Sequence, residues 1–406
     1  MRRKSIYRLA VIFMLLLCGC SSAKEQKAEA PIREELVLWS YYETDAQCQG
    51  LDKLVAEFNA SQWDYRMSWK YVPMSEFVKE LTIAVSDSTL PDIVLVDNPD
   101  MTGLVNSGFL EDITEELGED IAEKGYYEEV QMAVEFDEKV YGVPFCCNNT
   151  AIIYNKEMLE AAGVTPPQTW EEFEAAAKAL TVKGEEGHYG FAMSVAAGEQ
   201  GAFQFMPWIL STGADENHLE DERTTEAFEL MHRMITDGSM PNSCMNYSQT
   251  DIIRLFIEKD VAMIQNGSWA LPAIEAAGID YGICPLPIQN GQGVIIGGEN
   301  LAVLKGKNVK GAVEFMKFYN QEEVMQEVCV LMGNISPIQS LAEEFCEEHP
   351  QYSVFVSQMQ YGINRNSIKN WKHVCRVLSD SLHQLFGSTW SVTDIWYKYE
   401  QGILEE

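Results

Sequence analysis

Between residues 36 and 96 the sequence alternates strand-like runs with amphipathic segments, and this alternation restricts the possible fold more than any other feature. The runs at 36–39 and 93–96 are apolar throughout, and the run at 65–72 alternates well enough for a strand. The segment 51–58 carries apolar residues at the spacing of a helix with one buried face. Because strands that alternate with helices pair in parallel, the sequence predicts an α/β fold with a largely parallel sheet.

A second segment, residues 140–180, predicts a connection between two halves of the chain. The apolar run 150–154 follows a pair of asparagines and predicts a strand. Thr169, with Glu172 three residues later, predicts a capping box at the start of a helix. The apolar residues that follow at helical spacing, and that predict its buried face, are Phe173, Ala176, Ala177 and Leu180.

Length and composition predict a globular chain of two domains. At 406 residues the chain is too long for one core of ordinary size. The hydrophobic content of 46% and the charged content of 22% are close to the average for globular proteins. The 17 Tyr, 17 Phe and 9 Trp supply material for cores or for stacking surfaces.

The chain is strongly acidic, with a formal net charge of -33. Residues 1–19 carry four cations and no acid, so the rest of the chain is more acidic still. Such a charge repels nucleic acids and anionic lipid surfaces, and it disfavours phosphorylated ligands. We therefore expect a neutral or cationic ligand and no nucleic-acid partner.

The N-terminus predicts export. Arg2, Arg3, Lys4 and Arg8 precede the apolar run 9–17, which is too short to span a bilayer and has the shape of a signal peptide. The sequence Leu-Cys-Gly-Cys at 17–20 resembles the bacterial lipobox, so we expect cleavage after residue 19 and lipidation of Cys20. Residues 20–31 would then be a lipidated N-terminus and a polar linker on the extracytoplasmic face of the cell membrane. An uncleaved signal anchor is the open alternative.

The other eight cysteines are scattered, without a C-x-x-C pair, and we interpret them as mostly buried thiols. A disulfide among them, or one between the neighbours Cys146 and Cys147, stays open. None of the six histidines is paired at i, i+4, so we expect no metal site, and the sequence indicates no cofactor.

Candidate ligand-binding residues follow two strands of the first half. Tyr41, Tyr42 and Glu43 come just after the first strand, and Asp97 and Asn98 follow the third. Ligands of α/β sheets bind beyond the carboxyl ends of strands. Aromatic rings beside carboxylates and amides suit a sugar, whose C–H face packs on a ring while its hydroxyls need hydrogen-bonding partners.

The second half offers similar groups. Trp269 follows the predicted strand 261–264 and a Gln-Asn pair, and Trp208 lies before a Ser-Thr-Gly at a helix end. The adjacent glycines at 297–298 suggest a close backbone approach. A phosphate-binding loop is the competing interpretation, but the lysine and spacing of a P-loop are absent and Glu299 would repel phosphate.

Several short motifs together resemble the bacterial extracellular solute-binding proteins of the sugar-binding kind. In chain order they are Pro-Asp-Ile at 91–93, Tyr-Gly-Val-Pro at 141–144, Tyr-Asn-Lys at 154–156, Thr-Trp-Glu-Glu at 169–172, Asn-Gly-Ser-Trp at 266–269, Pro-Leu-Pro at 285–287 and Gly-Gly at 297–298. The resemblance covers nearly all of the expected mature chain, and its plan is similar to that of maltose-binding protein. It implies a lipoprotein that captures a carbohydrate and delivers it to the permease subunits of an ATP-binding-cassette (ABC) importer.

The resemblance also implies a type II periplasmic-binding-protein-like fold: two α/β lobes, each a mostly parallel sheet flanked by helices, with the ligand cleft between them. The first lobe would comprise residues 32–146 and 297–335, and the second residues 150–293 and 340–406. Hinge crossings would lie at 147–149, 294–296 and 336–339.

Carried over to this sequence, the resemblance implies a set of binding residues. The aromatic platforms would be Tyr41 or Tyr42, Trp208, Trp269 and Trp371, and the polar and backbone contacts Glu43, Asp97, Asn98, Asn148, Gly298, Glu299 and Asn300. The sequence departs from the family at Asn364-Arg365-Asn366, where prolines are frequent, and at Cys146-Cys147, where larger residues are frequent. We expect the second departure to influence sugar preference.

The leading hypothesis is therefore a monomeric, lipid-anchored carbohydrate-binding protein without catalytic activity. An extracellular glycosidase is the alternative, because paired carboxylates and aromatic platforms would serve it equally well. Asp97 and Glu299 would be its carboxylate pair.

Overall fold

The computed structural model describes residues 33–87 and 89–405. The predicted signal peptide, the lipidation site Cys20 and the linker lie outside the described residues. From Glu34 onwards the chain forms one compact unit. In the described part, helices that combine the length and the apolar character needed to cross a membrane are absent.

The first sheet has five strands in the order β2-β1-β3-β12-β6. They are β1 (Glu34–Ser40), β2 (Tyr65–Tyr71), β3 (Ile93–Asp97), β6 (Gly142–Pro144) and β12 (Glu299–Val303). Strand β1 pairs in parallel with β2 and β3, as the alternation of strands and helices predicts. Strand β12 lies antiparallel between β3 and β6, and places Glu299 directly opposite Asp97.

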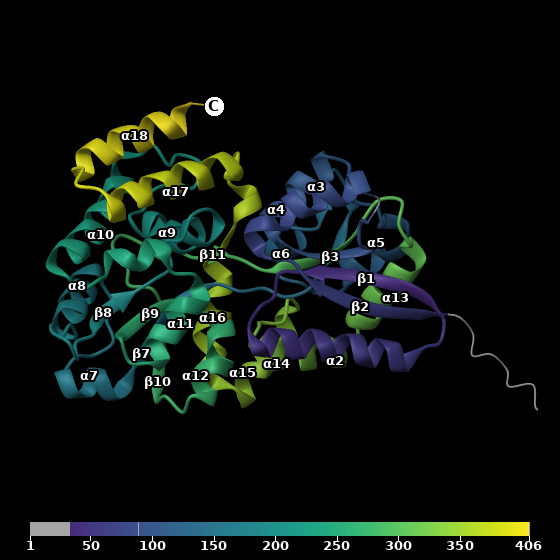
Figure 1. Ribbon diagram of the computed structural model, residues 1–406, viewed down its shortest axis with the longest axis horizontal. Helices are drawn as coiled ribbons and strands as arrows, with labels where there is room; N and C mark the ends of the chain where they lie inside the picture. The colour runs from purple at the N-terminus through teal and green to yellow at the C-terminus, as the bar shows by residue number, and fades with distance from the viewer. Residues whose placement is uncertain (1–32, 88, 406) are drawn as a thin grey trace, which may run out of the picture. The chain divides into compact units, whose positions relative to one another are not determined.

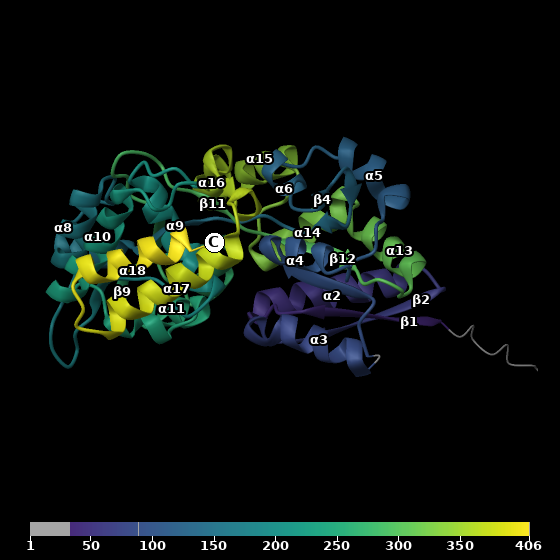
Figure 2. The same ribbon diagram turned by 90° about the horizontal axis from the view of Figure 1, so that it is seen from above.

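Helices cover both faces of this sheet, and some come from distant parts of the chain (Figures 1 and 2). They are α2 (Asp45–Ser61), α3 (Phe77–Asp87), α4 (Asn98–Asn106), α5 (Thr114–Glu123), α13 (Val309–Tyr319) and α14 (Glu322–Met332). The short helix α6 (Glu128–Gln131) instead buries Val130 in the core around the second sheet. Helix α2 buries Leu51, Leu54 and Phe58, the face predicted from their spacing. Helix α14 packs beside α2 although about 270 residues separate them in sequence.

The second sheet has four strands in the order β10-β7-β9-β8. They are β7 (Thr150–Asn155), β8 (Tyr189–Ala192), β9 (Val261–Gly267) and β10 (Tyr281–Cys284). Only β8 and β9 pair in parallel, because β7 runs against both of its neighbours. The α/β class is confirmed, and in detail both sheets are mixed. Strands β7 and β12 follow the connections between the two sheets, and each runs opposite to the other strands of the sheet it joins.

The helices around the second sheet come from the middle and the end of the chain (Figure 1). They are α7 (Lys156–Ala162), α8 (Trp170–Ala179), α9 (Glu199–Ser211), α10 (Thr225–Asp237), α11 (Gln249–Ile257), α12 (Leu271–Ala276), α15 (Gln339–Glu348), α16 (Ser353–Gln358), α17 (Trp371–Gly387) and α18 (Val392–Leu404). The predicted capping box of α8 is confirmed, since Thr169 and Glu172 each bond the backbone of the other.

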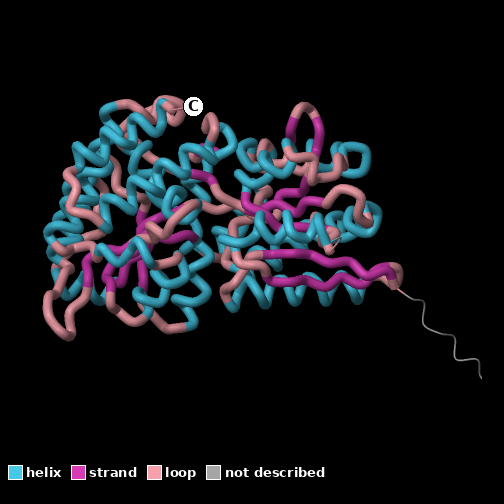
Figure 3. Tube along the Cα trace, turned by 45° about the horizontal axis from the view of Figure 1, so that its top comes forward, coloured by secondary structure: helices cyan, strands magenta, loops and turns pink. Residues whose placement is uncertain are grey.

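Two separate hydrophobic cores result, one around each sheet. Leu38, Leu95 and Leu301 belong to the first core, and Ile152, Phe191 and Met263 to the second. Figure 3 shows the strands of each sheet enclosed by helices. Four further short strands are β4 (Glu135–Phe136), β5 (Lys139–Val140), β11 (Ile295–Ile296) and β13 (Ile363–Asn364).

Three chain segments pass between the sheets side by side. The backbone N–H of Cys147 donates to the carbonyl of Ile335 at 3.1 Å, and that of Asn148 donates to the carbonyl of Gly297 at 3.0 Å. The reverse bonds are also formed, at 3.3 and 2.8 Å. The residue boundaries of the two lobes and of the hinge stay predictions.

The eight cysteines of the described part are free thiols, and five of them are buried. The prediction of mostly buried thiols is therefore confirmed. Cys146 and Cys147 are both free and almost completely buried.

Candidate functional site

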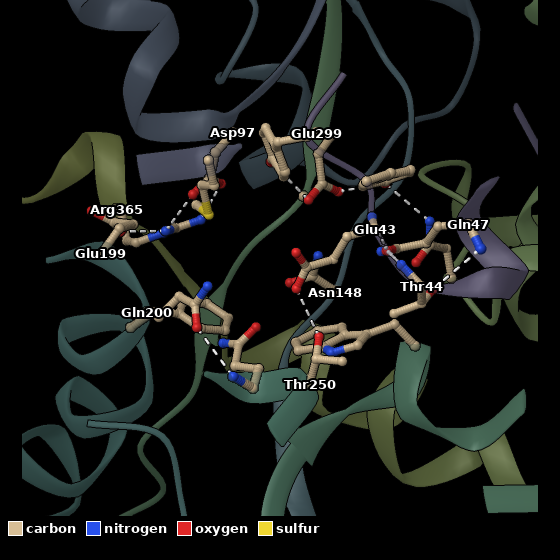
Figure 4. Close-up of a pocket in the computed structure, with 18 residues that line it drawn as sticks. Glu43, Thr44, Gln47, Asp97, Asn148, Glu199, Gln200, Thr250, Glu299 and Arg365 are labelled. Carbon is tan, nitrogen blue, oxygen red and sulfur yellow. Dashed lines mark hydrogen bonds and ion pairs between the residues drawn. The ribbon is translucent and has the colours of Figure 1, made fainter. Parts of the chain in front are cut away.

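A pocket opens at the carboxyl ends of strands from both sheets, beside the three connecting segments (Figure 4). Its space for the centres of water-sized molecules is about 110 Å³. Tyr41, Tyr42 and Glu43 reach it from the loop after β1, Asp97 from the end of β3, and Glu299 from the start of β12. These side chains reach the pocket because they lie at, or just after, the edge of the first sheet.

Glu299 is held by three side-chain donors at one edge of the pocket. Tyr41 Oη donates to its Oε1 at 3.0 Å, and Tyr42 Oη donates to its Oε2 at 2.9 Å. Cys146 Sγ donates to the same Oε2 at 2.8 Å. Burial raises the pKa of Glu299, and the bonds from Cys146, Tyr42 and Tyr41 oppose that rise because they favour the ionised form. The carboxylate thus fixes both tyrosines at the pocket edge.

The same network reaches the third connecting segment. Asn334 Nδ2 donates to Tyr42 Oη at 3.2 Å, and Tyr42 is only 2% exposed. Tyr42, Cys146, Glu299 and Asn334 therefore join the loop after β1 to all three connecting segments through buried polar groups. Burial and the Glu299 carboxylate raise the pKa of the Tyr41 hydroxyl well above its ordinary value, so it stays protonated and donates.

The connecting segments approach closely at the pocket, where a glycine is required at position 298 and a side chain at position 297 would displace Asn148. A Cβ atom on Gly297 would lie 2.2 Å from Asn148 Oδ1. A Cβ atom on Gly298 would lie 2.3 Å from the carbonyl oxygen of Cys146, and its φ of +144° also disfavours other residues. The close backbone approach predicted from the adjacent glycines is confirmed, and it leaves Asn148 on the pocket wall.

Trp269 provides a half-buried indole ring on the pocket wall that the second half of the protein forms. It belongs to a short 3₁₀ turn, Ser268–Ala270, that directly follows β9. The ring lies over the backbone of Gly267, where an added Cβ would be 1.9 Å from Trp269 Cζ3. Gly267 therefore makes room for the ring, which lines the pocket and also packs against the second core.

A buried ion cluster of Asp97, Glu199 and Arg365 closes one side of the pocket (Figure 4). Arg365 Nη1 donates to Asp97 Oδ2 at 2.8 Å, and Nη2 donates to Asp97 Oδ1, so the pair is bidentate. Arg365 Nη1 also donates to Glu199 Oε1. The Arg365 side chain is 3% exposed, and its Cζ lies 4.7 Å from the centre of the Phe203 ring.

Two helix N-termini support this cluster. Asp97 is the N-cap of α4 and accepts the backbone N–H of Asn98 at 2.9 Å. Glu199 is the first residue of α9, where the helix dipole favours a negative charge. Burial raises the pKa of Asp97 to about 7 although Arg365 opposes that rise. Burial alone would lower the pKa of Arg365, but the two carboxylates, Asp97 and Glu199, raise it by a larger amount. The guanidinium group is therefore always charged.

Hydrogen bonds also cross the opposite end of the pocket. Thr250 Oγ1, on α11, donates to Glu43 Oε1 at 2.9 Å and so joins the two halves of the protein. Next to Thr250, Gln249 donates its backbone N–H to Gln200 Oε1 at 3.1 Å, and both of these glutamines line the pocket. The pocket therefore combines aromatic rings with amide, hydroxyl and carboxylate groups. In the described ranges, no group of three or more His, Cys, Asp or Glu side chains is arranged to hold a metal ion.

Residues 53–354 match the family described as bacterial extracellular solute-binding protein. The chain belongs to this family. It is 22% identical over 353 residues to the multiple sugar-binding protein of Streptococcus mutans, a match that covers 81% of each protein. It is also 22% identical to the galactooligosaccharide-binding protein of Bacillus subtilis, with 82% of this chain and 77% of that protein covered. Among solved structures, the maltose-bound MalE3 of T. maritima shares the fold, with a TM-score of 0.82 and 18% identity over 91% of this chain and 99% of that chain.

Most of the predicted binding residues of this solute-binding protein line the pocket. They are Tyr41, Tyr42, Glu43, Asp97, Asn148, Trp269, Gly298 and Glu299. Their common property is position, since each lies just beyond the end of a strand or in a connecting segment.

Four predicted residues lie elsewhere. Trp208 is 1% exposed, packs against Phe173 and donates its Nε1 to Gln265 in the second core, so it cannot serve as a platform. Asn98 and Asn300 are buried and bonded to each other, which removes them from the pocket. Trp371 donates its Nε1 to Glu199 and lines a neighbouring cavity instead.

The largest omission from the sequence prediction is Arg365. It lies in a 3₁₀ turn, Arg365–Ser367, after the two-residue strand β13, and no periodic pattern marks it. The other pocket residues that were not predicted are Thr44, Gln47, Met74, Glu199, Gln200, Phe203, Gln249, Thr250 and Asn334. Most of them come from helix starts and loops that approach the pocket only in the folded chain.

The pair Cys146-Cys147 does not line the pocket. Cys147 Sγ donates to the backbone carbonyl of Ser336 at 3.3 Å, and Cys146 Sγ donates to Glu299 Oε2 at 2.8 Å. Cys146 Sγ also lies 3.3 Å from Tyr42 Oη, so Cys146 contacts two residues that line the pocket, Tyr42 and Glu299.

Proposed function

We propose that this solute-binding protein captures a neutral carbohydrate in the pocket beside its connecting segments. The observation that carries the proposal is the exposed part of the Trp269 ring, which lies among the polar groups of Asn148, Glu43 and Thr250. A sugar needs this combination, because its C–H face packs on a ring while its hydroxyls need donors and acceptors. The sugars after which the relatives from Streptococcus mutans and Bacillus subtilis are named support the same class.

The charges around the pocket support a neutral ligand over an anionic one. Glu43, Asp97, Glu199 and Glu299 face a single pocket-lining cation, Arg365. Both terminal nitrogens of that cation already donate to Asp97 or Glu199. A phosphate or carboxylate ligand would meet an excess of negative charge and no free guanidinium group.

Ligand capture would couple to a hinge motion of two lobes. We propose the first lobe at 32–146 and 297–335, the second at 150–293 and 340–406, and the hinge crossings at 147–149, 294–296 and 336–339. A ligand held between Tyr41 and Trp269 contacts both lobes, so it stabilises the closed arrangement more than the open one. The bond between Thr250 and Glu43 would break on opening.

The loaded protein would deliver its sugar to the permease subunits of an ABC importer as a monomer. Lipidated Cys20 would keep it at the outer surface of the cell membrane, with residues 20–31 as the leash. The signal peptide at 1–19 would be removed on export.

The carboxylates of the alternative glycosidase are Asp97 and Glu299. Asp97 is paired with Arg365, and Glu299 accepts hydrogen bonds from Tyr41, Tyr42 and Cys146. A glycosidase needs one carboxyl group free to protonate the leaving oxygen and one free to attack or to activate water. The saturation of both groups by protein donors supports binding over hydrolysis.

A sugar screen tests the proposed function. We expect one or a few neutral mono- or oligosaccharides to raise the melting temperature, because a ligand that binds only the folded state stabilises it by mass action. Tryptophan fluorescence should change with the same sugars, since Trp269 lines the pocket. Sugar phosphates should produce no shift. A flat response to a broad panel of neutral sugars would contradict the carbohydrate assignment.

Substitution of Cys20 tests the lipid anchor. Cys20→Ser removes the thiol at the lipidation position of the lipobox-like sequence, so the variant is expected in the soluble fraction while the wild type sediments with membranes. Cys48→Ser is the matched control, because Cys48 lies on α2 outside the signal region and its variant should remain on membranes. Membrane attachment of Cys20→Ser would contradict the anchor.

A further inference from the structure

A second cavity lies directly behind the ion cluster that closes the sugar pocket. Its space for the centres of water-sized molecules is about 620 Å³, compared with about 110 Å³ in the pocket itself. It is lined by side chains of α3, α4 and the start of α17, including Asp100, Asn106, Trp371 and Lys372. A tryptophan beside amide, hydroxyl and charged groups gives it the chemistry of a sugar subsite.

Each of the three residues of the ion cluster lies on the boundary between the pocket and the second cavity. Arg365 lines the pocket, and the next residue, Asn366, lines the cavity. Asp97 lines the pocket, and Asp100, one helical turn further along α4, lines the cavity. Glu199 lines both spaces, so its side chain lies in the partition itself.

Several contacts hold the partition of Arg365, Asp97 and Glu199 in place. Arg365 is held by a bidentate bond to Asp97, by Glu199 and by the face of the Phe203 ring. Trp371 Nε1 donates to both oxygens of Glu199 at 3.0 Å and fixes that carboxylate from the cavity side. The side chains of Arg365 and Asp97 are 3% and 7% exposed, so few ligand atoms could pass between them.

We propose that Arg365, together with Asp97 and Glu199, ends the sugar-binding pocket and so limits how far an oligosaccharide extends into the protein. A sugar chain would stop against the guanidinium group, and its further units would have to point away from the second cavity. Arg365 is therefore a residue that determines the chain-length specificity of the site. This inference rests on the proposed carbohydrate function.

The test compares chain-length dependence in the wild type and in the double variant Asp97→Ser/Arg365→Ala. Serine keeps an N-cap for α4, and removing Asp97 together with Arg365 avoids an unpaired charge at position 97. Glu199 remains, 23% exposed and still bonded by Trp371 Nε1. Asp380→Ser/Arg376→Ala is the matched control, because this pair of the same residue types is exposed on α17. The probes are linear α-1,4-linked glucose and β-1,4-linked galactose oligosaccharides of two to six units, measured by titration calorimetry.

In the double variant, the affinity for six units relative to two units should rise at least about tenfold, or about 1.4 kcal/mol, because further units enter the second cavity. The control variant should keep the wild-type ratio. A folded double variant with the wild-type ratio would overturn the partition while leaving the carbohydrate function intact. A wild type that binds neither probe series would overturn the inference for these oligosaccharides, whereas the carbohydrate function is decided by the broader sugar panel.

The substitution Thr102→Trp tests whether bound sugar reaches the second cavity, and it leaves the ion cluster unchanged. Thr102 lines only the second cavity, where a tryptophan would fill much of the space. In the wild-type background we expect unchanged affinity for every probe length, because the sugar does not reach this cavity. A selective loss of affinity for the longer probes would mean that sugar already passes Arg365, and it would overturn the inference even where the double variant fails to fold.

Discussion

Trp269→Ala is expected to lower sugar affinity at least about 100-fold, which corresponds to about 2.7 kcal/mol. The half-buried indole is the largest apolar surface that the second half of the protein presents to the pocket. Without it, the C–H face of the sugar would contact water and the edge of Gly267. Titration calorimetry with the sugar identified by the screen measures the loss.

The fold should tolerate this substitution, because the ring packs against the second core from outside and is only partly buried. Trp390→Ala is the matched control: Trp390 is 39% exposed and does not line the pocket, so its variant should bind normally. Gly267→Ala adds an independent check, since the new Cβ would displace the Trp269 ring and weaken binding without removing it. Normal affinity in Trp269→Ala would assign the ring to the core instead.

The fold was predictable because its signals are local. The strand and helix alternation of residues 36–96 and the capping box at Thr169 depend on neighbours within a few residues, and the structure contains both. The antiparallel insertion of β12 was not predictable in this way. It pairs Glu299 with Asp97, about 200 residues away, and depends on how the chain returns from the second sheet.

The pocket was predictable where residues end a strand, because the edge of a sheet collects such residues regardless of sequence distance. Trp269, just after β9, follows this rule, and Glu299 reaches the same edge because it begins the antiparallel strand β12. Trp208 was misplaced although a signal existed. Its helix, α9, buries residues on all sides, including Phe205, Met206 and Ile209 next to Trp208 in sequence, and a helix that is hydrophobic all round is buried.

Arg365 illustrates what a single sequence does not contain. Its neighbours Asn364 and Asn366 were noticed only as a departure from the expected prolines. Its function depends on two carboxylates, one 268 and one 166 residues earlier in the chain. No spacing rule connects such positions, so the partition at the end of the pocket became visible only with the packing of α4 and α9.

Arg365→Ala is expected to reduce the free energy of unfolding by about 3–5 kcal/mol at pH 8, the usual cost of leaving a buried charge without its partner. Asp97 would remain 5% exposed with one backbone donor and no cation. Arg376→Ala, which removes an exposed guanidinium from α17, should change stability by less than about 1 kcal/mol. Chemical denaturation of the three proteins at one pH measures these differences.

The pH dependence of that loss identifies its cause. Burial raises the folded-state pKa of Asp97 to about 7, so its contribution to stability is present at low pH and is lost as pH rises towards 7. Removing Arg365 raises this pKa further, because the opposing positive charge is gone. The variant should therefore lose further stability relative to the wild type as pH rises from 7 to 8, by at most about 1.4 kcal/mol. In Asp97→Ser/Arg365→Ala the loss at pH 8 should be smaller than in Arg365→Ala alone, since no unpaired carboxylate remains at position 97. An equal loss at pH 7 and pH 8 would indicate that Arg365 stabilises the protein through Glu199 and Phe203 and not through Asp97.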